Sequence, residues 1–429
     1  HLALRGMFYI LMESFPTLET IRPDGLRIIT KKLENTRRAL ISIHCLHGSA
    51  NDPEDRRGLF HFYEHMAFKG TKAKTEDQIS GIFERYSLDH DAYTSRVRTS
   101  FNASGVDRHT EIVGELLFDM YLNASFPEAE IGKEKEVIYN EIAQSQDNDY
   151  HELNKKLGEV LWDKNPQKYP ILGTNESVAN ITRDTLIKTR EASYIPSNTV
   201  VLAVGNVEHD SIREQANRYL PLSDKKAEKI HWNDESSIPP KEKEVVVEKS
   251  DLKKVGIIYT SKVQKMSDKD WATIQVLMRM LGKGSDSMMF QEVRKRRGYA
   301  YSTGGGMIGL DQLGWRTYFF AETLPQTKDQ AKNLIPEIIF RQPLNPEHFE
   351  RVREGFIDYW LVSRETPGSW EESILDLVLD TEKPVSDVDQ FPLYLVEVLS
   401  QMTIKDVEEI RHRLLLEDSF VCGILQPKK

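Results

Sequence analysis

Apolar and polar residues alternate along the first part of the chain as they do in paired β-strands, and longer stretches between these runs have apolar residues at helical spacing. The strands expected from this pattern cover residues 26–30, 39–46, 91–96, 99–104 and 197–206. The expected helices cover residues 76–85, 108–123, 127–142, 148–162 and 182–194. Strands and helices mixed in this order predict an α+β fold in which a sheet packs against helices.

The order of elements begins again after residue 243. Residues 222–243 are polar and charged and include Pro239 and Pro240, which is the composition of a linker. The elements expected after it are strands at 244–248, 254–259 and 418–425 and helices at 268–281 and 290–297. We therefore expect two homologous α/β-roll halves, residues 1–221 and 244–429, each a mostly antiparallel sheet packed with helices.

Composition narrows the class of protein. A chain of 429 residues, 39% hydrophobic and 29% charged, is a globular protein too long for one ordinary core. Its formal net charge of −10 argues against a nucleic-acid partner, since nucleic-acid binders normally carry a basic face. The two cysteines, Cys45 and Cys422, lie far apart and imply neither a disulfide framework nor a thiolate zinc site. A metal site would have to use histidine and carboxylate ligands.

The N-terminal apolar run, residues 7–12, stops at Glu13 and is too short to span a bilayer. No small-residue cleavage site follows this run. We therefore expect no membrane partner, and a cytoplasmic location is the default expectation.

The candidate chemistry lies in the segment His61-Phe62-Tyr63-Glu64-His65. On a helix, residues four apart share one face, so the imidazoles of His61 and His65 can converge on one metal ion. Glu64 lies beside them, close enough to reach a metal-bound water without being a ligand. This H-x-x-E-H order is found among zinc metallopeptidase motifs. The bare motif is equally compatible with two histidines that only fill a protein core.

A third ligand is expected from the helix that begins near residue 127. Glu134, Ile138 and Glu141 fall on one stripe of that helix, and the isoleucine indicates that the stripe faces protein. We select Glu141 as the third metal ligand and Glu134 as its neighbour, although an acidic stripe is more often a solvated face. His44 and His47 are the nearest rival ligands. A strand residue is the simpler interpretation of His44, since a β-strand places it and His47 on opposite faces.

Residues 58–71 resemble the zinc-binding segment of the M16 peptidases, the pitrilysin family or inverzincins, which includes mitochondrial processing peptidase subunits and shorter bacterial members. The family's third ligand is a glutamate that follows the second histidine by the 76 positions separating His65 from Glu141. Its additional acidic residue, seven positions earlier, matches Glu134. The resemblance implies that His61, His65 and Glu141 bind Zn2+ and that Glu64 is the general base.

Other segments extend the resemblance over nearly the whole chain. Ala92, Tyr93 and Thr94 are similar to the family's edge strand that pairs with substrate, although Val97 stands where many members have glutamate. Residues 290–302 resemble the segment that carries an Arg/Tyr pair, which corresponds to Arg294 and Tyr301. In the family this pair holds the substrate backbone or stabilises the oxyanion.

The resemblance implies a zinc-dependent endopeptidase whose two halves form a clamshell around peptides or unfolded segments. The chain resembles the family's short bacterial members, which form closed clamshells from two chains, so the resemblance implies a homodimer, with peptide substrates as the other partners. Two alternatives stay open. The first is a non-catalytic structural or binding subunit of a processing-peptidase-like complex. The second is a zinc hydrolase of another fold, in which His44 or His90 replaces Glu141.

Overall fold

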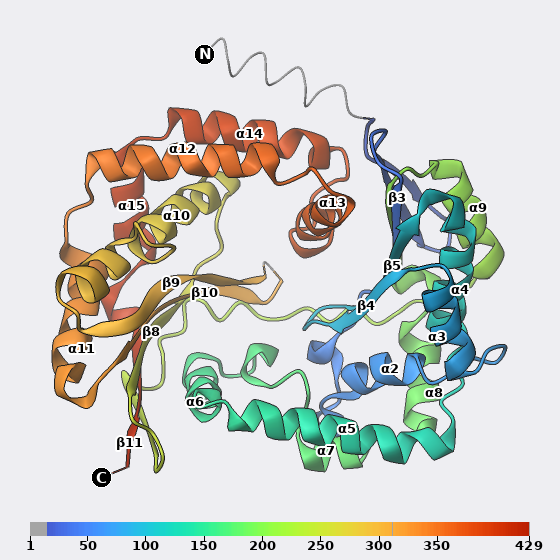
Figure 1. The fold of residues 1–429 in the computed structure, drawn as a ribbon, viewed down its shortest axis with the longest axis horizontal. Coiled ribbons are helices and arrows are strands. Elements are labelled where there is room, and N and C mark those ends of the chain that lie inside the picture. The colour runs from blue at the N-terminus through green and yellow to red at the C-terminus, as the bar shows by residue number, and fades with distance from the viewer. Residues whose placement is uncertain (1–14, 311, 429) are drawn as a thin grey trace. The chain divides into compact units, whose positions relative to one another are not determined.

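The computed structural model describes residues 15–310 and 312–428, and the apolar run at residues 7–12 lies outside them. The chain divides into two compact units (Figure 1). Unit 1 comprises the residues up to Gln144 together with Pro170–Ile230 and Ser363–Gln390. Unit 2 comprises Ser145–Tyr169, His231–Val362 and Phe391–Lys429.

Unit 1 is built on a six-stranded sheet with the order β1-β2-β6-β3-β5-β4. The strands are β1 (Leu18–Ile21), β2 (Arg27–Lys32), β3 (Arg38–Cys45), β4 (Asp89–Thr94), β5 (Thr99–Val106) and β6 (Thr199–Gly205). Only the pair β2–β6 is parallel. The central strands β3 and β6 are almost entirely buried, as expected for strands covered on both faces.

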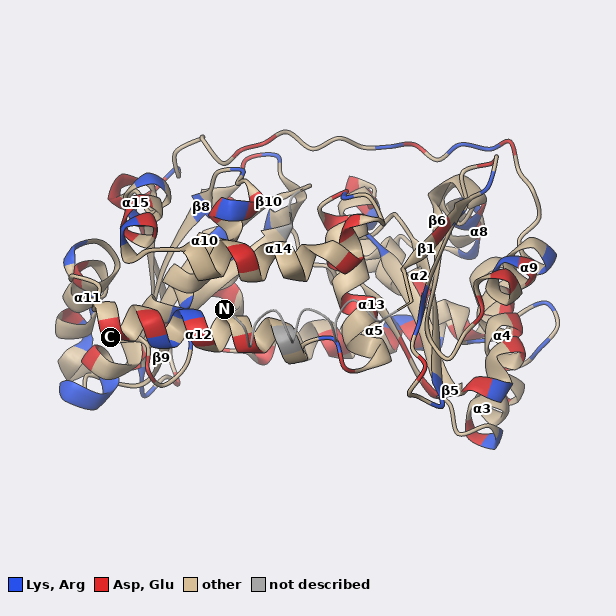
Figure 2. Cartoon of the chain, turned by 90° about the horizontal axis from the view of Figure 1, so that it is seen from above, with Lys and Arg blue, Asp and Glu red and all other residues tan. Residues whose placement is uncertain are grey.

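Helices cover both faces of this sheet. The helices of unit 1 are α2 (Leu59–Ala67), α3 (Glu76–Arg85), α4 (Thr110–Asn123), α5 (Glu128–Asp147), α7 (Asn175–Ala179), α8 (Arg183–Ser193), α9 (His209–Tyr219), α13 (Pro367–Ile374) and η9 (Leu375–Asp380), the last residues of α5 belonging to unit 2. The helices α4 and α9 pack on one face, and α13 packs on the other against β3 and β6 (Figures 1 and 2). Thr75 caps α3 through a hydrogen bond from the backbone N–H of Gln78, as its side-chain type predicts.

Unit 2 contains a five-stranded sheet with the order β7-β11-β8-β10-β9. Its strands are β7 (Glu244–Lys249), β8 (Val255–Val263), β9 (Ala300–Leu310), β10 (Gly314–Thr323) and β11 (Val421–Pro427). Its helices are α6 (His151–Leu161), α10 (Asp268–Leu281), η6 (Met289–Arg296), α11 (Lys328–Pro336), η8 (Glu337–Arg341), α12 (Pro346–Val362), α14 (Asp387–Gln401) and α15 (Ile404–Leu414), the first residues of α14 belonging to unit 1.

The two sheets repeat one topology. In unit 1, β2 runs parallel to β6, which is antiparallel to β3, which is antiparallel to β5. In unit 2, β7 runs parallel to β11, which is antiparallel to β8, which is antiparallel to β10. The edge strands β4 and β9 therefore correspond. The expectation of an α+β fold with two homologous, mostly antiparallel halves is confirmed.

Two segments belong to the compact unit other than the one that their position in the chain suggests: Ser145–Tyr169 to unit 2 and Ser363–Gln390 to unit 1. Leu153 and Leu157 of α6 belong to the core cluster of the second sheet, with Val247 and Leu425. Conversely, the segment Ser363–Gln390, which contains α13, belongs to unit 1. The boundaries expected at residues 221 and 244 follow chain order, and between Tyr219 and Glu244 the structure has neither helix nor strand.

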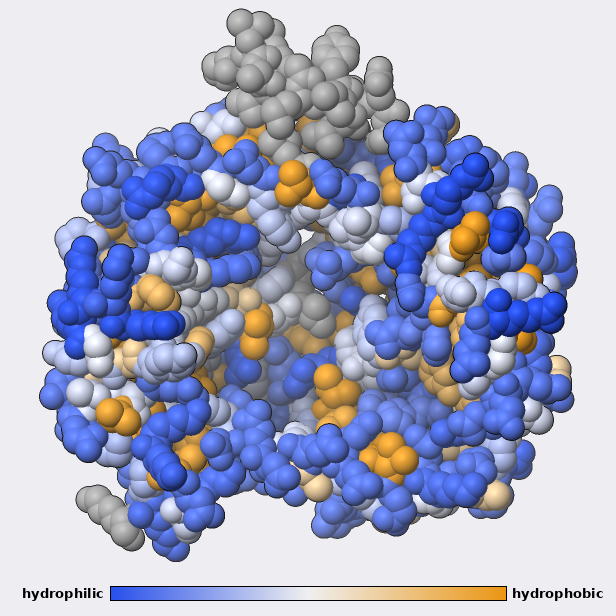
Figure 3. All heavy atoms as spheres, viewed as in Figure 1, coloured by the Kyte–Doolittle hydropathy of each residue, from blue (hydrophilic) through white to orange (hydrophobic). Residues whose placement is uncertain are grey.

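The surface is charged and mixed. Basic and acidic residues are interspersed over the helices of both units (Figure 2), and hydrophilic side chains cover most of the face seen in Figure 3. Within the described residues, the helices are all too short or too polar to cross a lipid bilayer.

Two buried cations of unit 1 depend on the segment that contains α13. The ammonium group of Lys31 on β2 is fully buried, 2.6 Å from the Asp389 carboxylate and 4.2 Å from the centre of the Trp370 ring. Arg98, the residue before β5, forms a buried ion pair with Asp380. Burial lowers the pKa of Lys31, and the hydrogen bond and charge of Asp389 oppose that shift. The segment therefore supplies the counter-charges for cations of the first sheet.

We expect Asp389→Asn to lower the free energy of unfolding by about 2–3 kcal/mol, because Lys31 keeps its burial but loses the nearest negative charge. Thermal or urea unfolding measures this change. Asp210→Asn is the matched control, since Asp210 forms an exposed ion pair with Arg213, and it should change stability by less than about 0.5 kcal/mol. Equal effects of the two substitutions would contradict the role of the buried pair.

Candidate metal centre

Hydrogen bonds and close backbone packing fix the start of α2, the helix that carries the histidines. The carboxylate of Asp52 accepts hydrogen bonds from the backbone N–H groups of Gly58, at 2.8 Å, and Phe60, at 3.0 Å. Gly58 adopts a left-handed conformation with φ of 90°, and a Cβ there would lie 2.4 Å from the carbonyl oxygen of Leu172. Glycine is therefore required at this position, and Asp52 satisfies donors that the first turn of α2 leaves unpaired.

Packing fixes which face of α2 carries the ligands. Phe62, Tyr63 and Met66 are completely buried in the core of unit 1. His61 and His65 occupy the remaining face, and their ring centres are 4.6 Å apart. The predicted helix at the H-x-x-E-H segment is thus confirmed, with both imidazoles on one side.

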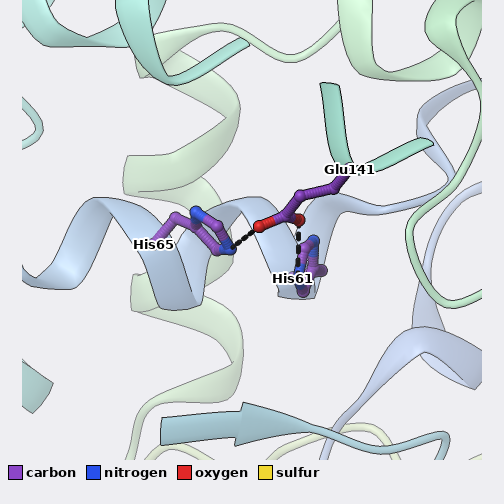
Figure 4. A group of neighbouring side chains, drawn as sticks. All are labelled: His61, His65 and Glu141. Carbon is purple, nitrogen blue, oxygen red and sulfur yellow. Dashed lines mark ion pairs between the residues drawn. The ribbon is translucent and has the colours of Figure 1, made fainter. Parts of the chain in front are cut away.

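The long helix α5 brings a carboxylate to this face. Ile131, Ile138 and Ile142 bury one side of α5, and Glu134 is buried with them. Glu141 comes next along the predicted stripe and points at both histidines (Figure 4). Its Oε2 lies 3.8 Å from Nε2 of His61, and its Oε1 lies 3.7 Å from Nε2 of His65.

These three residues form the one group in the described part of the chain that offers three ligand atoms within 4.8 Å of one another. Two imidazole nitrogens and one carboxylate oxygen are a donor set found in catalytic zinc sites, which keep a further position open. His61 also has a buried Nδ1 with no hydrogen-bond partner among the described residues. Its other ring nitrogen, Nε2, faces Glu141, and the donor set fits a zinc ion.

A chain of charged groups orients the second histidine. Glu134 Oε1 lies 2.7 Å from Nδ1 of His65, so Nε2 is the nitrogen that faces Glu141. Glu134 Oε2 lies 3.1 Å from the ammonium group of Lys69, which lies 3.0 Å from Glu76. A carboxylate that fixes the tautomer of a ligating histidine is a common support of zinc sites. Lys69, which the sequence patterns did not single out, holds that carboxylate in place.

The two histidines differ in their electrostatic surroundings. Burial, together with the charge of the neighbouring His65 and against the opposing charge of Glu134, lowers the pKa of His61 to about 3. Burial also acts to lower the pKa of His65, but the hydrogen bond with Glu134 and the charge of Glu141 outweigh it and raise the pKa overall. His61 is therefore neutral near pH 7, as a metal ligand must be.

Glu64 lies on the same helix and is only 8% exposed. Its Oε2 accepts a hydrogen bond from the hydroxyl of Thr94 at 2.6 Å. Burial raises the pKa of Glu64, the Thr94 hydrogen bond and His65 oppose this shift, and the charges of Asp91 and Glu141 add to it. A buried carboxyl with a raised pKa beside a candidate metal site is typical of general acid–base groups.

The rival histidines lie elsewhere. The ring of His44 is completely buried between the hydroxyls of Ser100, at 2.8 Å, and Ser42, at 2.9 Å. His90 stacks on Phe83 with ring centres 3.7 Å apart. Neither belongs to the three-ligand group. The alternative set with His44 or His90 in place of Glu141 is therefore not assembled.

The remaining predicted residues lie on edge strands. Ala92, Tyr93 and Thr94 are the last residues of β4, which stands at one end of the strand order in unit 1 and pairs with β5. Within unit 2, the guanidinium of Arg294 on η6 lies 4.9 Å from the ring centre of Tyr301 on β9. Tyr301 is 81% exposed. The structure thus brings Arg294 and Tyr301 together.

Comparison with known proteins gives consistent matches. Residues 27–175 match the family model described as insulinase (peptidase family M16), and residues 180–356 match the M16 peptidase inactive domain. An uncharacterized zinc protease of Rickettsia bellii is 30% identical over 77% of this chain and 79% of its own. An uncharacterized zinc protease of Bacillus subtilis is 24% identical over 94% of this chain and 97% of its own.

Solved structures share the fold. A protease from Helicobacter pylori has a TM-score of 0.83 and 18% identity, covering 96% of this chain and 100% of its own. An M16 peptidase inactive domain from Pseudomonas fluorescens has a TM-score of 0.84 and 15% identity, covering 97% of this chain and 98% of its own.

We expect Lys69→Met to weaken zinc binding by about tenfold, because the Glu134 carboxylate that orients His65 loses its cation. Competition with a chromophoric chelator measures the affinity. Lys69→Arg should retain most of it. Lys133→Met is the control on α5, since Lys133 forms an exposed pair with Glu130. Unchanged affinity in Lys69→Met would show that Glu134 needs no cation.

Proposed function

The chain belongs to the insulinase family of peptidases, peptidase family M16, and we propose that it is a zinc-dependent endopeptidase. The observation that carries the proposal is the convergence of His61, His65 and Glu141 on one face of α2, with Glu64 beside them. The zinc-protease names of its relatives agree with this donor set.

In this mechanism, His61, His65 and Glu141 hold the metal ion. When bound, zinc supplies a Lewis acid that polarises the scissile carbonyl and lets water lose a proton near neutral pH. Glu64 takes the proton from the attacking water and passes it to the departing amine. Glu134 keeps His65 in the tautomer that presents Nε2 to the metal.

The substrate is a peptide or an unfolded segment that adds to β4 as a further strand. Edge addition fixes the peptide backbone through main-chain hydrogen bonds and leaves side-chain preference loose. Arg294 and Tyr301 are proposed to hold the substrate backbone or to stabilise the oxyanion. The clamshell chamber and the cytoplasmic location stay predictions.

A homodimer is proposed from the family resemblance. Light scattering should give the mass of two chains, and a protein that stays monomeric at working concentrations would contradict the proposal.

The alternative function is that of a non-catalytic subunit, and the description of residues 180–356 as an inactive domain gives it a specific basis. That match covers residues outside the ligand set, which lies within the insulinase match at residues 27–175. The intact ligand set and base favour the enzyme.

Two substitutions separate the enzyme from the alternatives. Glu64→Gln should keep one zinc per chain and lose at least about 100-fold in cleavage of a quenched fluorescent peptide, because the general base is removed. Glu141→Gln should lose most of its zinc, because a neutral amide is a weaker ligand than a carboxylate. Elemental analysis gives the zinc content.

Cleavage that survives in Glu64→Gln would contradict the assigned base. A wild-type protein that binds zinc and cleaves none of a broad peptide library would support the non-catalytic subunit instead.

A further inference from the structure

Thr94 is the only described residue whose side chain makes a hydrogen bond with Glu64 in the structure, at 2.6 Å from its Oε2. Hydrogen bonds from a hydroxyl to a carboxylate at this distance are among the stronger ones in proteins. We propose that Thr94 is a positioning residue that fixes the carboxylate of Glu64 for proton transfer. This inference rests on the proposed peptidase function and adds a role to a residue that the family resemblance assigns only to substrate pairing.

The hydroxyl of Thr94 has one proton to donate and two acceptors near it. The carbonyl oxygen of Phe60 lies 3.5 Å away, compared with 2.6 Å for Glu64 Oε2. The shorter contact to a charged acceptor is favoured. Oε2 is therefore engaged, and Oε1 remains the oxygen that takes up and returns the proton.

One short segment holds both partners of this hydrogen bond. Asp52 caps the start of α2, the helix that carries Glu64. Three and two residues earlier, the backbone N–H groups of Ser49 and Ala50 donate to the carbonyl oxygens of Ser95, at 3.0 Å, and Arg96, at 2.9 Å. Residues 49–52 thus connect the first turn of the metal helix directly to the turn that follows Thr94.

This connection leaves little room for adjustment. A Cβ on Gly48 would lie 2.4 Å from the carbonyl oxygen of Ser95 and 2.7 Å from the backbone nitrogen of Arg98. The turn itself is closed by a hydrogen bond from the N–H of Ser95 to the carbonyl of Arg98, at 2.8 Å. The hydroxyl of Thr94 is consequently held at a set distance from α2, which is the property a positioning group needs.

The arrangement couples substrate binding to the base. Thr94 is the last residue of β4, the edge strand proposed to pair with the peptide. The strand that sets the register of the peptide backbone is therefore also the strand that orients the carboxylate of Glu64. A shift of this strand would move the scissile bond and the base together.

The simpler interpretation is that Thr94 only satisfies a buried carboxylate. In that case its loss would lower stability and leave the chemical step untouched. Positioning predicts the reverse: a lower kcat with little change in KM, zinc content or unfolding temperature, and recovery by any side chain that keeps the hydroxyl.

Thr94→Val removes the hydroxyl at nearly constant shape. We expect it to keep one zinc per chain, to change KM by less than about twofold and to lower kcat by about 10- to 100-fold. Thr94→Ser should recover kcat to within a few-fold of the wild type. Thr20→Val, on the opposite edge strand β1, removes a hydroxyl bonded to His209 at 2.8 Å and should leave kcat unchanged.

A wild-type kcat in Thr94→Val would overturn the inference, and so would a Thr94→Ser variant as impaired as Thr94→Val. If Thr94→Val loses zinc or fails to fold, and Thr94→Ser does not recover kcat, Thr94 has a structural role only and the inference is wrong. These outcomes are distinct from failure of the proposed function, which would appear as a zinc-loaded wild-type protein that cleaves no peptide.

Discussion

Two imidazoles on successive turns of one helix can hold a metal ion only if a third donor reaches them from another element. In this protein that donor is Glu141, and its position depends on the packing of α5 into the core of unit 1 through Ile131, Ile138 and Ile142. The same helix supplies Glu134, which fixes the tautomer of His65. The placement of one buried helix against another thus sets both the ligand geometry and its support.

Much of this site follows from local rules. Helical spacing predicts that His61 and His65 share a face, and the stripe on α5 predicts that Glu134 and Glu141 point the same way; the structure agrees on both. The contact of Lys69 with Glu134 and that of Thr94 with Glu64 do not follow from such rules, because each joins segments distant in sequence. Composition and periodicity carry no signal for such contacts.

In the fold too, local features follow from the sequence pattern and contacts between distant segments do not. Alternation and capping residues locate most strands and helices, and even the weak internal repeat corresponds to a shared strand topology. The hydrophobic pattern does not predict that α6 belongs to unit 2. The apolar face of an amphipathic helix shows that this face is buried, but it does not show which sheet covers it. For the same reason, the pairing of Lys31 with Asp389 could not be foreseen.

The two sheets share one topology, but only unit 1 carries the candidate metal ligands. The helix that follows β8 in unit 2, α10, corresponds in order to the α2 region that follows β3, yet it contains no histidine. Chemistry therefore depends on a few side chains placed on a duplicated scaffold. The most direct test is a zinc titration of the metal-free wild-type protein with peptide cleavage followed at each step. Cleavage should rise in proportion to bound zinc and stop rising at one equivalent, whereas saturation with zinc without cleavage, or full cleavage before zinc is added, would contradict the account.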